Sequence, residues 1–381
     1  MAPTRRGEAM EILRLWWLMW ACALAGLVLG QDARGEGPAA PAGMRPAAEG
    51  RGFATTPEQM ERVVSYCEKM TAERPAGPGG GEGQRPDARW VASICPHDDY
   101  VYAGPVYADA LRHLKAKTVI LFGVCHQAKK WGLKDQLVFD GFTSWQEPFG
   151  PVKVSPLRDE IVKGLPKGDY VVHDEAQASE WSVEGIVPWL QYAGRDVQIV
   201  SILVPYMDWG RTDALAKDLS DVLAGIVKAR HLELGKDLAF VMSSDGVHYG
   251  DQWADGWSYA PFGVGADGYL KAMGQDQCLV QWYLDGGLER GRIERLAETL
   301  VDQKDVTRYK VTWCGRFSVT LGLDVLSYLT EKLSLPALEG VQVGYGTSIG
   351  TGFLPFEEVG LSATAHENLH HWVSYIAEAY R

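Results

Sequence analysis

The sequence predicts an α/β protein in which helices flank a mainly parallel central sheet. Its predicted strands are continuous apolar runs, such as TVILFGV at 118–124 and VQIVSILV at 197–204. Segments with helical patterns separate these runs along the chain. Strands that are apolar on both faces and alternate with helices are typical of parallel sheets that helices cover on each side.

The N-terminal segment, residues 1–30, has the composition of a signal peptide. Arg5, Arg6 and Arg14 precede an apolar run that extends over residues 15–30. That run is shorter than the roughly 20 residues that a transmembrane helix needs. We therefore expect export to the periplasm or the extracellular space, with no other membrane attachment. Residues 31–54 are rich in Gly, Ala, Pro and Arg and are expected to form a disordered linker.

One domain is expected over residues 55–381. Thr56 and Pro57 begin a helix, because Thr56 is a capping residue, proline is favoured at the first helical position, and Gln59 completes a capping box. A flexible insert rich in Gly and Pro follows at 73–88. The sequence then predicts strands at 90–95, 118–124, 197–204, 237–244 and 341–348, and helices at 105–115, 211–230 and 318–333.

The composition excludes several classes of protein. The formal net charge is −12 and the chain has no basic block, so we expect no nucleic-acid partner. Six cysteines are too few for a disulfide scaffold. Removal of Cys22 with the signal peptide would leave an odd number, which predicts a thiol that is free or metal-bound. The sequence leaves open whether Cys95 and Cys125 form a disulfide.

Residues that bind metals or transfer protons follow the ends of several predicted strands. His97 follows the first strand, His126 the second, and Asp245 and His248 the fourth. In open α/β sheets, ligands bind in the crevice outside the carboxyl ends of the strands, so we expect these side chains to lie together. Asp245 can orient His248, which would then move a proton as a general acid or base.

The segment WCGRF, residues 313–317, adds a thiol and a cation at the start of a predicted helix. A helix N-terminus lowers the pKa of a thiol, which favours Cys314 as a thiolate nucleophile or metal ligand. Arg316 can clamp an anionic group. A Ser-His-Asp hydrolase that uses Ser243 or Ser244 is an alternative, but the G-x-S-x-G motif that exposes such a serine is missing.

A competing metal motif lies near the C-terminus. His366, Glu367 and His370 match H-E-x-x-H, which on a helix places two zinc ligands on one face beside a general base. No third histidine follows in the usual context, and so short a pattern arises by chance in long chains. A zinc metalloprotease using residues 366–370 is kept as an alternative to a solvated C-terminal helix.

Read together, segments between residues 95 and 365 resemble the MEMO family, protein B of the AmmeMemoRadiSam gene systems. The resembling segments, in family order, are PHDDYVYAGP, FGVCHQ, SWQEPFGPVKVS, SEWSVEGIVPWLQY, SSDGVHYG, CGR and VGYGTSIGTG. Two departures from the family pattern matter. Asp98 and Asp99 stand where the family has small residues, which predicts a more negative pocket, and Trp181 stands where the family usually has a histidine.

The resemblance implies the α/β fold of the class III extradiol dioxygenases, in which two histidines and a glutamate hold a non-haem iron. MEMO-like proteins have a cysteine in place of the glutamate, so the resemblance implies that His97, His126 and Cys314 hold one metal ion. Two imidazoles and a thiolate suit iron or copper, and zinc is a further candidate. His248 falls where the dioxygenases have an acid–base histidine, with Asp245 beside it.

These observations favour an enzyme that performs redox or oxygen-dependent chemistry on a small organic substrate. His248 and Asp245 would handle protons, and Arg316 would hold an anionic group. The alternative is a non-catalytic protein that binds a small ligand or a peptide in the same aromatic-rich pocket, which the presence of Trp181 favours. The gene systems of the family imply radical-SAM and AMMECR1-like partner proteins.

Overall fold

The computed structural model describes residues 42–47, 52–72, 89–253, 258–350 and 353–381. The predicted signal peptide at 1–30 and the predicted insert at 73–88 lie outside these residues. In the part of the chain that is described, no helix has the length and hydropathy needed to cross a membrane. The described residues belong to one compact unit that begins at Ala42.

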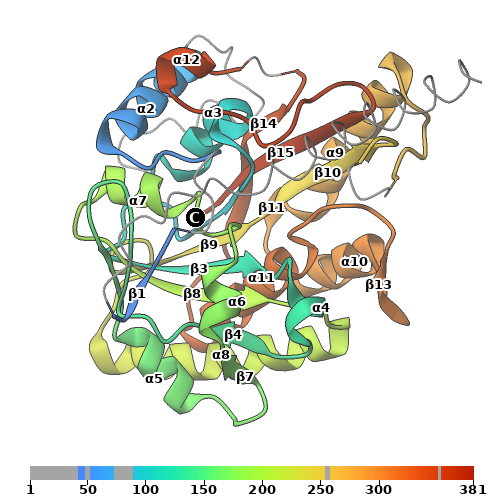
Figure 1. The fold of residues 1–381 in the computed structure, drawn as a ribbon. Helices are drawn as coiled ribbons and strands as arrows, with labels where there is room; N and C mark the ends of the chain where they lie inside the picture. Colours follow the sequence, from blue (N-terminus) through green and yellow to red (C-terminus); the bar gives the residue numbers. More distant parts are fainter. Residues whose placement is uncertain (1–41, 48–51, 73–88, 254–257, 351–352) are drawn as a thin grey trace, which may run out of the picture. The chain divides into compact units, whose positions relative to one another are not determined.

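A 13-stranded sheet forms the centre of this unit (Figure 1). The strands across it are, in order, β1 (Met44–Arg45), β5 (Ser144–Trp145), β6 (Val152–Val154), β8 (Gln198–Val204), β3 (Thr118–Val124), β9 (Leu238–Ser243), β2 (Ala92–Cys95), β15 (His371–Tyr380), β14 (Glu339–Thr347) and β11 (Gly286–Gly287). Off this path, β4 (Leu137–Phe139) pairs with β8 and β7 (Tyr170–Val172), and β10 (Asp245–Gly250) pairs with β15. A separate hairpin contains β12 (Val301–Asp302) and β13 (Asp305–Tyr309). Strands β6, β8, β3, β9 and β2 are parallel, which confirms the prediction of a mainly parallel sheet.

Helices cover both faces of the sheet (Figure 1). One face packs against α5 (Leu157–Gly164), α8 (Trp209–Arg230), α9 (Ala266–Tyr283), α10 (Arg290–Leu300) and α11 (Arg316–Lys332). The other packs against α2 (Pro57–Ala72), α3 (Tyr100–Leu111), α7 (Val187–Ala193) and the short helices α4 (Ala128–Trp131), α6 (Asp174–Ala178) and α12 (Phe356–Val359). In β3, Ile120 and Phe122 enter the first core, whereas Val119 and Leu121 enter the second. Both faces of this strand are therefore buried, which explains its uninterrupted apolar run.

The N-terminal helix α2 begins as predicted. The Gln59 N–H donates to Thr56 Oγ1 at 3.3 Å, and the Thr56 N–H donates to Gln59 Oε1 at 3.3 Å, which completes the capping box. Helix α3, in contrast, begins at Tyr100 and contains Pro105, which had been predicted as its first residue. Pro105 has no N–H to donate to the Val101 carbonyl, so the N–H of Leu354 donates to it instead, at 2.9 Å. The sequence around Pro105 could not reveal this distant partner.

The expected solvated helix at the C-terminus is wrong. Residues His371–Tyr380 form β15, a buried strand between β2 and β14. Its Trp372, Tyr375 and Ile376 are fully buried. Without β15, the edges of β2 and β14 would lack hydrogen-bond partners, and pairing them outweighs the local preference of the chain.

Part of the predicted linker is ordered. Within residues 31–54, Arg45 lies in β1 and is fully buried. Its guanidinium donates to the carbonyl oxygens of Gln177 at 2.9 Å and Glu180 at 2.6 Å. It also pairs with Glu184 at 3.1 Å and lies 4.2 Å from the centre of the Trp145 ring. This arginine therefore ties the N-terminal strand to the segment that carries Glu180.

We predict that Arg45→Met will destabilise the domain by about 3 kcal/mol, because it leaves the buried carboxylate of Glu184 without its cation. Urea denaturation followed by circular dichroism measures this change in the free energy of unfolding. The double variant Arg45→Met/Glu184→Gln should lose less than the sum of the two single variants, because it buries no unpaired charge. A loss in the double variant that equals the sum of the two single losses would contradict the assigned ion pair.

Candidate metal centre

The two predicted histidines, His97 and His126, lie on either side of the end of strand β9. Strand β9 lies between β3 and β2, and the parallel register pairs Ser243 at its end with Cys95 at the end of β2. His97 follows β2 and His126 follows β3, and their rings pack edge to face with centroids 5.2 Å apart. The donor atoms of His97, His126 and Cys314 all lie within 4.8 Å of one another. The structure therefore brings together three residues that can hold a metal ion.

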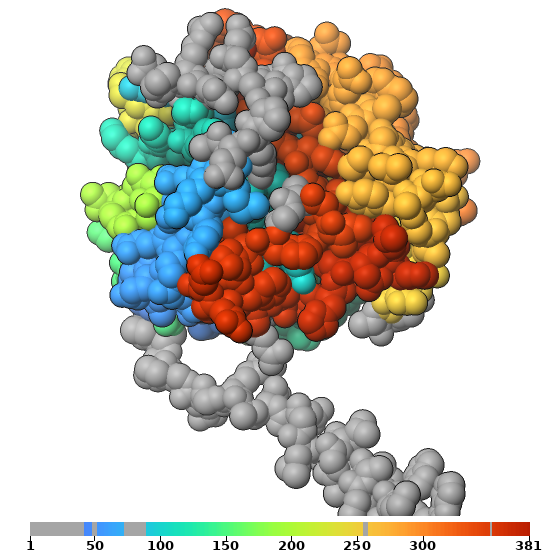
Figure 2. All heavy atoms as spheres, turned by 90° about the horizontal axis from the view of Figure 1, so that it is seen from above, coloured from blue at the N-terminus to red at the C-terminus, as the bar shows by residue number. Residues whose placement is uncertain are grey.

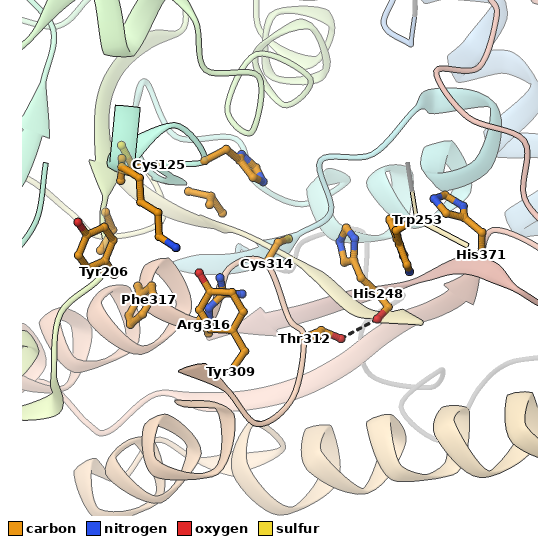
Figure 3. Close-up of a pocket in the computed structure, with 15 residues that line it drawn as sticks. Cys125, Tyr206, His248, Trp253, Tyr309, Thr312, Cys314, Arg316, Phe317 and His371 are labelled. Atoms are coloured by element: carbon orange, nitrogen blue, oxygen red, sulfur yellow. Dashed lines mark hydrogen bonds between the residues drawn. The ribbon is translucent and has the colours of Figure 1, made fainter. Parts of the chain in front are cut away.

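Cys314 reaches this site from the loop before α11 (Figure 3). Its Sγ lies 3.1 Å from His97 Nε2 and accepts the backbone N–H of Asp245 at 3.1 Å. Gly315 makes the approach possible, because a Cβ at this position would overlap the Ser243 carbonyl oxygen and the Ser244 side chain. A residue larger than glycine would push Cys314 away from His97.

Ser243 fixes which nitrogen of His97 carries the proton. The Ser243 hydroxyl donates to the carbonyl oxygen of Ser182, which can only accept. Its oxygen is then left to accept from His97 Nδ1, 2.7 Å away. His97 is therefore protonated on Nδ1, and the lone pair of Nε2 points toward Cys314. Sequence reasoning considered Ser243 only as a nucleophile and missed this positioning role.

Glu180 fixes which nitrogen of His126 carries the proton. Its carboxylate accepts the His126 backbone N–H at 2.8 Å and lies 2.8 Å from His126 Nδ1. The ring of His126 also stacks on Trp181 with centroids 4.4 Å apart. His126 is the most exposed of the three residues, but only 23% of its side chain is accessible. Its Nε2 is therefore left free, as in carboxylate–histidine–metal arrangements.

The electrostatics of the site favour a neutral imidazole at His97. Burial lowers the pKa of His97 to about 4, although the nearby Asp245 opposes this shift. Burial alone would raise the pKa of Asp245, but His97 and His248 outweigh it and lower that pKa. Burial and Asp245 raise the pKa of the Cys314 thiol well above its usual range. Without a bound cation, the prediction that the helix N-terminus favours the Cys314 thiolate is therefore wrong. A bound cation would supply the missing stabilisation, so the donor set fits a metal ion.

The predicted proton-handling pair is adjacent to the three donors. Asp245 Oδ2 lies 3.4 Å from His97 Nε2 and 3.7 Å from His248 Nε2. The second distance is longer than a direct hydrogen bond. His248 Nε2 is buried and has no hydrogen-bond partner among the described residues, whereas the His248 carbonyl accepts from Thr312 at 2.7 Å. The carboxylate of Asp245 therefore lies between two imidazoles.

A cavity of about 550 Å³ opens beside the three donors (Figure 3). It is lined by Val124, Cys125, His126, Ala128, Lys129, Val204, Tyr206, His248, Trp253, Tyr309, Thr312, Cys314, Arg316, Phe317 and His371. The predicted site residues His126, His248, Cys314 and Arg316 thus share one cavity. Its volume falls in the range of small-molecule sites.

The adjacent acids Asp98 and Asp99 do not act as expected. Neither lines the cavity, and the negative charge of Asp98 acts there only as one of the smaller causes that raise the pKa of the Cys314 thiol. Asp98 accepts from the Tyr375 hydroxyl at 2.7 Å, and Asp99 accepts from the Thr364 hydroxyl at 3.0 Å. Neither orients the imidazole of His97, which Ser243 holds instead.

The Ser-His-Asp hydrolase is not assembled. Ser243 contacts His97 rather than His248, and the Ser244 hydroxyl donates to the Asp245 carbonyl oxygen at 2.6 Å. Cys95 and Cys125 are not joined in a disulfide. The hydroxyls of Ser243 and Ser244 therefore bond to His97 and to backbone carbonyls rather than to His248.

The H-E-x-x-H segment does not form a zinc site in the described structure. Residues 366–370 form a loop rather than a helix, and β15 begins at His371. His370 pairs with Asp251 at 2.8 Å. Glu367 accepts from Ser348 at 2.9 Å and lies 3.2 Å from His371 Nδ1. The helical face that the motif requires is therefore absent from these residues.

An α/β sheet with two imidazoles at the ends of parallel strands, and a thiol beside them from the loop before α11, defines a candidate metal-binding protein of the dioxygenase-like fold. The chain belongs to the Memo-like protein family, whose model matches residues 45–348. This match confirms the resemblance found in the sequence.

Several curated relatives carry the description MEMO1 family protein. The chain is 28% identical to one from Methanothermobacter thermautotrophicus over 55% of its own length and 70% of the relative. It is 29% identical to one from Thermococcus kodakarensis over 49% of the chain and 61% of the relative. It is 34% identical to one from Methanococcoides burtonii over 42% of the chain and 55% of the relative. The last two alignments therefore span less than two thirds of the relatives.

We predict that Ser243→Ala will weaken metal binding by about 10- to 100-fold, because it removes the acceptor that fixes the tautomer of His97. Competition with a chromophoric chelator measures the affinity. Ser182→Ala is the matched control: it keeps the carbonyl that Ser243 uses and removes only a hydroxyl that donates to Val124. Equal affinities of the two variants would rule out the positioning role.

Proposed function

We propose that the protein is an enzyme with one metal ion, which performs redox or oxygen-dependent chemistry on a small organic substrate. One observation carries the proposal: three donor atoms from different parts of the chain lie within 4.8 Å of one another beside a cavity. His97, His126 and Cys314 would hold the ion. Two imidazoles and one thiolate leave further coordination positions and suit iron or copper, with zinc as a third candidate. Iron or copper would supply one-electron chemistry.

His248 and Asp245 would carry out proton transfer to and from the substrate. Asp245 lies within 3.7 Å of His248 Nε2, and its own Oδ1 accepts the backbone N–H of His97 at 2.9 Å. A carboxylate held in this way stabilises the protonated form of His248 after it takes a proton from the substrate. His248 lines the cavity, so it can transfer that proton without leaving its strand. Arg316, also in the lining, would hold an anionic group of the substrate.

A non-catalytic binding protein is the second candidate. Trp181 stacks on His126, where it covers one face of the proposed ligand. The cavity walls also contain Tyr206, Trp253, Tyr309 and Phe317, which would bind an apolar ligand or a peptide side chain. Substrate turnover that depends on His248 distinguishes the enzyme from this candidate.

Export and partner proteins belong to the same proposal. The arginines and the apolar run at 1–30 support export to the periplasm or the extracellular space. Family membership supports radical-SAM and AMMECR1-like partners. Membrane fractionation of cells that express the full chain and affinity capture from the native source test these two points.

The first prediction of this proposal concerns metal content. The full chain, purified without oxygen, should hold one iron or copper ion, and Cys314→Ala and His97→Ala should each lose most of it because each removes a donor. Elemental analysis of the purified variants measures the stoichiometry. His370→Ala is the control, because His370 pairs with Asp251 outside the three donors. Stoichiometric metal in the Cys314→Ala/His97→Ala double variant would refute the site.

The second prediction concerns proton transfer. His248→Gln should keep its metal but consume oxygen about 100-fold more slowly with ascorbate as the electron donor, because it removes the acid–base group. An oxygen electrode measures the rate, with metal content determined on the same sample. His370→Ala again serves as the control. A wild-type rate in His248→Gln would contradict the role of this residue.

A further inference from the structure

The charges that line the cavity are of one sign. Lys129 and Arg316 are cations, and His126, His248 and His371 contribute imidazoles. None of the described lining residues is Asp or Glu. The chain as a whole carries a net charge of −12, so its composition does not account for a cation-lined cavity. A cavity lined in this way raises the local concentration of anions.

Arg316 is already fixed in the wall of the cavity. One of its N–H groups donates to the Trp313 carbonyl oxygen, and its guanidinium carbon lies 3.3 Å from the centre of the Tyr309 ring. The Nε–H is buried and has no hydrogen-bond partner among the described residues. A buried donor without an acceptor destabilises the protein unless a ligand supplies one. The N-terminus of α11 begins at this residue and adds positive potential.

Aromatic and imidazole rings form the other side of the cavity. In Figure 3, Arg316, Tyr309 and Phe317 lie on one side of Cys314, whereas His248, Trp253 and His371 lie on the other. The Trp253 ring is 5.3 Å from that of His248 and 3.9 Å from that of His371. The carboxylate of Glu367, 3.2 Å from His371 Nδ1, raises the pKa of His371. Glu367 of the H-E-x-x-H segment therefore supports the cavity wall.

We propose that the substrate is a flat organic carboxylate, with its carboxylate on Arg316 and Lys129 and its apolar part toward Trp253. This inference rests on the proposed function, because it names the substrate class of the same cavity. An arginine fork matches the two oxygens of a carboxylate, and charge-assisted hydrogen bonds of this kind are the stronger ones. In this orientation, the middle of the substrate lies beside Cys314.

Calorimetric titration of the full chain with three probes that share one ring tests the proposal. Benzoate should bind at least about 10-fold more tightly than benzyl alcohol, and benzylamine should bind most weakly. Arg316→Gln should weaken benzoate binding by about 10-fold or more and leave benzyl alcohol unchanged, whereas Arg316→Lys should lose less. Arg195→Gln is the control, because Arg195 lies over Phe149 and outside the cavity lining.

The same titration in Cys314→Ala separates this inference from the proposed function. Benzoate should still bind this variant even if its metal is lost, because Arg316 and Lys129 remain. Benzoate binding that disappears in Cys314→Ala would place the anion on the metal and overturn the proposal. Equal affinity for the three probes, or no effect of Arg316→Gln, would also overturn it. If Arg316→Gln does not fold, Lys129→Met at the exposed end of the cavity should weaken benzoate binding about 3-fold.

Discussion

The parallel register of β2 against β9 is the constraint on which the site depends. It pairs Cys95 with Ser243, so the chain that continues from β2 brings His97 against the end of β9. Ser243 can then accept from the His97 imidazole, and Asp245 can contact both His97 and Cys314. A shift of one residue in this register would turn Ser243 to the opposite face of the sheet. The positions of the donors are therefore a consequence of strand pairing.

Buried polar groups hold the second histidine in a comparable way. Glu180 orients His126, and the carbonyl of Glu180 in turn accepts from the fully buried Arg45. Burial of these groups opposes folding unless every charge has a partner. Because Arg45 also pairs with Glu184, the first strand of the sheet stabilises a segment that reaches the site. The ordering of the chain near its N-terminus and the geometry around His126 are thus coupled.

The cations Lys129 and Arg316 line the cavity, whereas none of its described lining residues is an acid. Asp98 and Asp99 accept hydrogen bonds from Tyr375 and Thr364 and do not line the cavity, whereas Arg316 does. Asp245 and Glu180 are the acids beside the donors: Glu180 orients His126, and His97 and His248 lower the pKa of Asp245. A cavity with this distribution of charge suits an anionic ligand beside the three donors. Glu367, which does not line the cavity, raises the pKa of His371 in the cavity wall.

The sequence alone determined the sheet and the positions of most site residues. The apolar run of β3, the capping box of α2 and the polar residues after strands follow from local patterns, because periodicity and burial act over a few residues. Tertiary structure decided the rest. Distant parts of the chain supply the Leu354 N–H that allows Pro105 inside α3 and the strands that pair with residues 371–380. They also supply the acceptors Ser243 and Glu180, which orient the two histidines. Cys314 also depends on folding, since 217 residues separate it from His97 and no local pattern encodes a contact over that distance.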